Sequence, residues 1–144
     1  MNNVENAVSC FKTKFNCSQA IFSTYGPKLG IDRGSCLKIA EIFGGGMAYM
    51  GNVCGAVTGA FMVIGLKYGR KRDNDEQAKE KAYDAATRFV EEFKTRNGTI
   101  MCRELIDFDL STPEQRELAR EKNIFDKCQK FVQDSAEILE KIIS

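Results

Sequence analysis

Apolar and small side chains recur at helical spacing along most of the chain. Near the C-terminus, Cys128, Phe131, Ser135, Ile138 and Ile142 stand three and four positions apart. This spacing places side chains on one face of a helix, which then packs against a core. No segment alternates apolar and polar residues over the length of a strand. The pattern predicts an all-α fold, a compact bundle of about five helices that forms one domain over residues 1–144.

Capping signals and glycines set the ends of the predicted helices. Asn16 followed by Gln19 has the form of a capping box, and the helix that it opens should stop before Pro27. The run Gly44–Gly46 lies outside any helix, because consecutive glycines lose too much backbone entropy when a helix forms. Asn52 is predicted to cap the helix that follows this run.

The segment from residue 42 to residue 66 contains no charged side chain. It has the length of a membrane span, but Gly44–Gly46 and Asn52 divide it into two pieces. The second piece, residues 53–66, has the length of a helix buried in a soluble bundle. We therefore predict a buried, glycine-rich central helix in a protein that is not itself transmembrane.

Gly51, Gly55 and Gly59 recur at every fourth position of this segment. In a helix this spacing places them on one face, where another backbone can lie close. Cys54 stands beside that face. We expect the glycines to let a second cysteine-bearing helix approach Cys54.

The charges of the chain are balanced, with 21 Lys and Arg against 20 Asp and Glu and a formal net charge of +1. A nucleic-acid-binding protein needs a basic excess to neutralise phosphates, so nucleic acid is not an expected partner. The first fifteen residues lack the basic and apolar regions of a signal peptide. We therefore expect a cytoplasmic protein whose thiols stay reduced.

The chain has six cysteines and no histidine. The absence of histidine excludes zinc sites of the Cys/His type and every Cys–His or Ser–His catalytic pair. Cys10 and Cys36 fall within helical stripes and are expected to pack as apolar residues. The other four cysteines follow predicted caps: Cys17 after Asn16, Cys54 after Asn52, Cys102 after Thr99 and Cys128 after Asp126. Free N–H groups and the helix dipole stabilise a thiolate in a first helical turn, so these four are the candidate catalytic residues.

Three interpretations of these four cysteines remain open at this point. In the first, some pair cycles between dithiol and disulfide, and the sequence leaves the pairing undetermined. In the second, all four thiolates bind zinc or an iron–sulfur cluster, although no Cys-x-x-Cys chelate is present. In the third, the protein is a non-catalytic helical module, whose glycine face and C-terminal stripe bind a second copy of the chain or a membrane partner.

Several motifs, in order along the chain, resemble one known family. They are NCSQ at 16–19, FGGGM at 43–47, CGAVTGA at 54–60, GLKYG at 65–69, CREL at 102–105, and Cys128. They resemble the CGAxxG proteins, also called the C_GCAxxG_C_C family, whose members are described as redox-active. The resemblance implies redox or electron-transfer activity, with Cys17, Cys54, Cys102 and Cys128 as the characteristic cysteines. It also implies a redox or transporter partner, because family members tend to be encoded near transporter genes.

The sequence departs from the family pattern at Ala48-Tyr49, where many relatives carry glycine and arginine. An arginine at that position would help to lower the pKa of a nearby thiol. The departure therefore implies weaker thiolate activation in this protein than the family pattern suggests.

Overall fold

The computed structural model describes residues 1–144, and its regular structure is entirely helical. The α-helices are α1 (Asn3–Lys12), α2 (Cys17–Tyr25), α3 (Arg33–Ala40), α4 (Gly55–Tyr68), α5 (Glu76–Asn97), α6 (Cys102–Ile106), α7 (Pro113–Glu121) and α8 (Cys128–Ile142). Three 3₁₀ helices lie between them: η1 (Gly26–Leu29), η2 (Glu41–Phe43) and η3 (Ile124–Lys127). The all-α prediction is confirmed, but a bundle of about five helices understates the count. Short helices such as α6 and α7 are separate elements, which the longer apolar stripes did not reveal.

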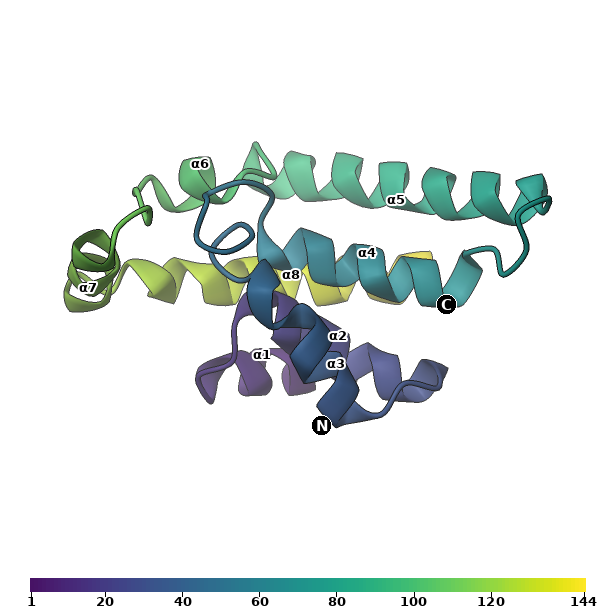
Figure 1. Ribbon diagram of the computed structural model, residues 1–144, viewed down its shortest axis with the longest axis horizontal. Helices are drawn as coiled ribbons and strands as arrows, with labels where there is room; N and C mark the ends of the chain where they lie inside the picture. The colour runs from purple at the N-terminus through teal and green to yellow at the C-terminus, as the bar shows by residue number, and fades with distance from the viewer.

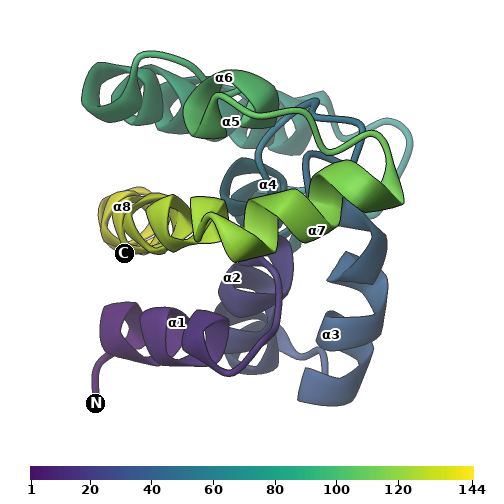
Figure 2. The ribbon, with the colours of Figure 1, turned by 90° about the vertical axis from the view of Figure 1, so that its left-hand side faces the viewer.

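The helices form layers around one long core (Figure 1). Helix α5 lies along one side, α4 and α8 form the middle, and α1 and α2 lie on the opposite side (Figures 1 and 2). Helix α3 flanks α2, and α7 leads into α8 at one end of the molecule. The apolar stripe of α8 is buried as predicted, since its core residues are largely or completely excluded from solvent.

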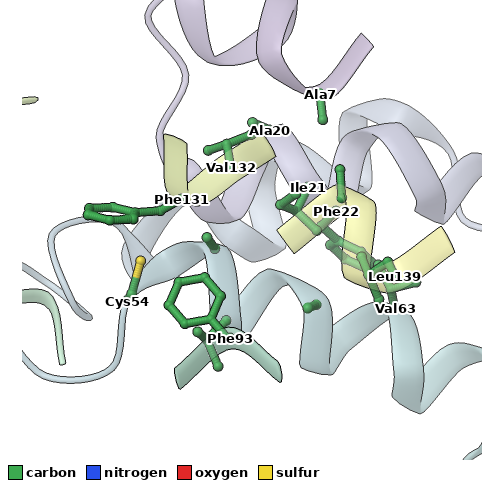
Figure 3. Close-up of a cluster of buried hydrophobic side chains, with 14 of the residues drawn as sticks. Ala7, Ala20, Ile21, Phe22, Cys54, Val63, Phe93, Phe131, Val132 and Leu139 are labelled. Atoms are coloured by element: carbon green, nitrogen blue, oxygen red, sulfur yellow. The ribbon is translucent and has the colours of Figure 1, made fainter. Parts of the chain in front are cut away.

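Helix α4 is the buried, glycine-rich helix expected from the sequence. Its first six residues, Gly55–Ala60, are all buried. Around it, Phe89 and Phe93 of α5 stack with their ring centroids 6.0 Å apart. Phe93 also lies 6.4 Å from the ring of Phe131 on α8. Figure 3 shows Phe93 and Phe131 within the same buried cluster as Cys54.

Helices α2 and α4 cross where the glycines of α4 leave no side chain between them. A Cβ atom on Gly59 would lie 2.9 Å from the carbonyl oxygen of Ser18, and one on Gly55 would lie 2.9 Å from the Ser18 nitrogen. The predicted close approach of a second cysteine-bearing helix is therefore correct for these two glycines. Gly51 does not share the face, because it lies in the preceding loop with φ +72°.

No helix in the structure is both long enough and apolar enough to cross a membrane.

Candidate functional site

The four candidate cysteines stand at the starts of four helices. Cys17, Cys102 and Cys128 are the first residues of α2, α6 and α8, and Cys54 is the N-cap of α4. The predicted caps are correct only for Cys17, where Asn16 and Gln19 exchange the two hydrogen bonds of a capping box at 2.9 and 3.0 Å. Counted from their predicted caps, Cys54 would be the second residue of its helix, Cys102 the third and Cys128 the second. Each lies one or two positions nearer the helix start than that.

Asn52, Thr99 and Asp126 do not cap these helices because each has another role in the fold. Asn52 is held in a backbone pairing with the start of α6, so α4 begins three residues later. The Thr99 hydroxyl accepts from the Met101 N–H instead of capping α6. Asp126 lies inside η3, which leads directly into α8.

A short antiparallel pairing joins the segment before α4 to the start of α6. Cys54 N–H donates to the Ile100 carbonyl at 2.8 Å, and Cys102 N–H donates to the Asn52 carbonyl at 2.6 Å. Val53 and Met101 form the bridge between these bonds. Because side chains alternate along extended backbone, Cys54 and Cys102 lie on the same side of the pairing. Sequence reasoning missed this element, since one bridge is too short to give an alternating pattern.

Cys17 is a neighbour of both Cys54 and Cys128, since both thiols raise its pKa. Cys17 can approach Cys54 because residue 55 is a glycine. A Cβ atom on Gly55 would lie only 3.2 Å from the Cys17 Cβ. Cys102 lies within electrostatic range of Cys54 and Cys128. The structure thus brings all four predicted cysteines to one place, from helices that are far apart in sequence.

The four thiols have different electrostatic environments. A hydrogen bond from the Cys17 thiol lowers the pKa of Cys54, and the N–H groups of Ala56 and Val57 add to that effect against the cost of burial. The pKa of Cys17 itself is raised, first by its contact with Cys128 and then by its contact with Cys54. Burial, together with the nearby Cys54 and Cys128, raises the pKa of Cys102 to about 12. Of Cys17, Cys54 and Cys102, Cys54 is therefore the thiol best placed to ionise.

All six cysteines are free thiols, and those of the site are well covered. The exposed fractions are 4% for Cys54, 8% for Cys102 and 7% for Cys128, whereas Cys17 is half-buried. Of the two cysteines predicted to pack as apolar residues, Cys36 is fully buried, and Cys10 is half-buried beside the Ser23 hydroxyl. A reagent can reach Cys54, Cys102 or Cys128 only if part of their covering moves.

A scan against protein-family models matches residues 15–142 to one family, described as "Putative redox-active protein (C_GCAxxG_C_C)". The chain belongs to this family. The match spans all four cysteines of the site and nearly the whole chain. Searches of curated proteins and of solved structures found no match.

The thiols of this C_GCAxxG_C_C protein do not form a ready metal centre. No three Cys, Asp or Glu side chains are placed so that they could hold one metal ion together. The residues therefore do not fit the proposed zinc or iron–sulfur cofactor as they stand. The four-sulfur metal site stays a prediction from the sequence.

The pKa order of the thiols predicts which cysteine of this family member reacts first. Alkylation by iodoacetamide between pH 6 and 10 should modify Cys54 with a pH midpoint below the ordinary thiol value of about 8.5, because only the thiolate attacks. Cys102 should stay unmodified until much higher pH. Peptide mass spectrometry after short pulses gives each midpoint, which does not depend on the access that limits the absolute rate. If the midpoint of Cys54 is higher in the folded protein than in the denatured protein, the folded structure does not lower the pKa of Cys54, and the prediction is wrong.

Proposed function

We propose that this protein is a thiol–disulfide redox protein in which Cys54 is the attacking thiolate and Cys17 is the thiol that joins it in the oxidised form. The observation that carries the proposal is the close crossing of α2 and α4, where the Cβ position of Gly55, next to Cys54, lies 3.2 Å from the Cys17 Cβ. The N–H groups of the first turn of α4 stabilise the attacking sulfur. The membership of a family described as redox-active supports the same chemistry.

The proposed reaction transfers two electrons from the protein to a disulfide substrate. The Cys54 thiolate attacks one substrate sulfur, the substrate S–S bond breaks, and a mixed disulfide forms. Cys17 then attacks the Cys54 sulfur and releases the substrate as a dithiol, which takes the Cys17 proton and one proton from solvent. The protein is left with a Cys17–Cys54 disulfide, which a cellular dithiol reduces again by the reverse exchange.

The electrostatics of Cys17 suit the second step of this reaction. The contacts with Cys128 and with Cys54 both raise its pKa in the reduced protein. Once Cys54 is bonded to a substrate sulfur it no longer carries a negative charge, so one of these two causes disappears. Cys17 therefore becomes easier to ionise at the moment when its attack is needed. Cys128 is the other thiol that raises the pKa of Cys17, so we propose that exchange can pass the disulfide of Cys17 from Cys54 to Cys128.

Controlled oxidation tests the proposal. Treating the reduced protein with oxidised glutathione and digesting it without reductant should give a Cys17–Cys54 peptide pair, detected by mass spectrometry. Replacing Cys54 by serine should abolish both this pair and the mixed disulfide with glutathione. Replacing the buried Cys36 by serine is the matched control and should preserve both. If the wild-type protein forms no linked pair among the four cysteines of the site, the proposal is wrong.

A further inference from the structure

The segment from Gly44 to Gly51 has a backbone that its side chains disfavour. Five consecutive residues, from Gly45 to Tyr49, have positive φ values. Three of them carry side chains: Met47 at +69°, Ala48 at +50° and Tyr49 at +62°. Residues with a Cβ atom visit this left-handed region as single residues and hardly ever in a run. Such strain persists only where surrounding contacts hold it in place.

Identifiable contacts hold the segment in this conformation. Ala48 N–H donates to the Ile42 carbonyl at 2.6 Å, and Gly51 N–H donates to the Gly45 carbonyl at 3.0 Å. Outside the segment, the guanidinium of Arg116 on α7 lies 4.6 Å from the centre of the Tyr49 ring. The contact between an arginine and an exposed aromatic ring is weak. The N–H groups of Met47, Tyr49, Met50 and Asn52 donate to further carbonyls between residues 43 and 47, and the Arg103 N–H donates to the Gly51 carbonyl at 3.1 Å. Most of the hydrogen bonds that hold the closed conformation are therefore local to residues 42–52.

The segment lies against the starts of three of the four cysteine-bearing helices. Gly44 packs on the Asn16 side chain that caps α2, since a Cβ there would lie 2.6 Å from the Asn16 Nδ2. Gly46 packs on the Cys102 side chain, 2.7 Å from such a Cβ. The carbonyl of Phe43, just before the segment, lies 3.3 Å from the Cβ position of Gly55. Figures 1 and 2 show the loop, drawn in blue, between α6 and the start of α4.

The outer end of the segment is open to solvent. Ala48, Tyr49 and Met50 are exposed. An open pocket of about 490 Å³ borders Met50 and Gly51, next to Arg103 at the start of α6. Thiol–disulfide exchange needs direct contact between sulfur atoms. The buried Cys102 thus lies behind a strained segment whose other side faces solvent, and Cys54 lies beside Cys102 in the pairing of Val53 with Met101.

We propose that segment 44–51 is a gate, and that its release admits a disulfide substrate to Cys54 and Cys102. The use of the gate by a disulfide rests on the proposed function, but the gate itself does not. Any thiol reagent of similar size enters by the same route. Because the strain is relieved on opening, changes in the strain set the fraction of time for which the gate is open.

Substitutions of Ala48 test the gate in both directions. The residue is exposed, so a change acts mainly through the backbone. Glycine accepts the left-handed conformation and should keep the gate closed, lowering the alkylation rate of Cys54 and Cys102 about fivefold. Valine is β-branched and tolerates the conformation poorly, so it should raise both rates about fivefold or more. The rates are measured with monobromobimane and peptide mass spectrometry, at pH 7.5 for Cys54 and at a higher pH, at which Cys102 reacts, for Cys102.

The variant Gly30→Ala is the matched control. Gly30 has φ +103° and no atom within 4 Å of its Cβ position, so alanine adds backbone strain between η1 and α3, outside the gate. It should leave both alkylation rates unchanged. Equal rates in wild type, Ala48→Gly and Ala48→Val would overturn the gate, as would equal acceleration by Gly30→Ala and Ala48→Val. If the valine variant does not fold, the glycine variant alone decides. A working gate in a protein that forms no disulfide would leave this inference standing and would refute the proposed function.

Discussion

Replacing Gly55 by alanine should separate Cys17 from Cys54 and slow the formation of their disulfide at least tenfold. The added Cβ would lie 2.9 Å from the Ser18 nitrogen and 3.3 Å from the Phe43 oxygen, and both are backbone atoms that cannot rotate away. Helix α2 must therefore shift from α4, and its first residue is Cys17. Overpacking of this kind should also lower the free energy of unfolding by about 1–3 kcal/mol.

The matched variant for this test lies on the same helix. Gly65 has no atom within 4 Å of its Cβ position, so alanine fits without a clash. Gly65→Ala should raise the free energy of unfolding by about 0.5–1 kcal/mol and leave disulfide formation unchanged. Guanidinium unfolding and quenched oxidation time courses measure the two quantities. If Gly55→Ala forms the disulfide as fast as Gly65→Ala does, the close crossing does not position the thiols.

Replacing Phe93 by alanine should lower the free energy of unfolding by about 3–5 kcal/mol, the largest effect on stability that we expect. The ring is fully buried and lies against Phe89 and Phe131, so its removal leaves a cavity between α5 and α8 (Figure 3). A loss of this size is a large share of the 5–15 kcal/mol that stabilises a typical domain.

Tyr83 on the same helix provides the comparison for Phe93. It is 70% exposed, so Tyr83→Ala should change the free energy of unfolding by less than about 0.5 kcal/mol. Urea or guanidinium unfolding followed by circular dichroism measures both variants. A loss below about 1 kcal/mol for Phe93→Ala would show that the core closes around the missing ring.

The sequence could predict the helix starts only where the capping signal is local. Asn16 and Gln19 are three residues apart, and their two hydrogen bonds form as the motif predicts. Asn52 has the same capping residue type, but its backbone carbonyl is taken by the Cys102 N–H, fifty residues away along the chain. A hydrogen bond between residues so far apart cannot be predicted from the local sequence around Asn52. The starts of α4 and α6 were therefore misplaced, although their cysteines were correctly assigned to helix ends.

The ionisation of the thiols was beyond sequence reasoning for a related reason. The position at a helix start favours a thiolate at each cysteine separately. In the structure the four thiols are neighbours, and neighbouring groups of like charge cannot all ionise. The pKa is accordingly lowered at Cys54 and raised at Cys17 and Cys102. The glycine spacing did predict the close approach of a second helix, because that contact requires only that α4 has no side chain at Gly55 and Gly59.

The long separation of Cys17 and Cys54 along the chain has a consequence for the folding equilibrium. A bond between them would close a loop that contains the whole of α3 and the strained segment. A disulfide that closes a ring of about forty residues lowers the conformational entropy of the unfolded chain. This raises the free energy of unfolding by about 4 kcal/mol. Oxidation would then act as a covalent staple, and the reduced and oxidised forms would differ in their resistance to heat and proteases.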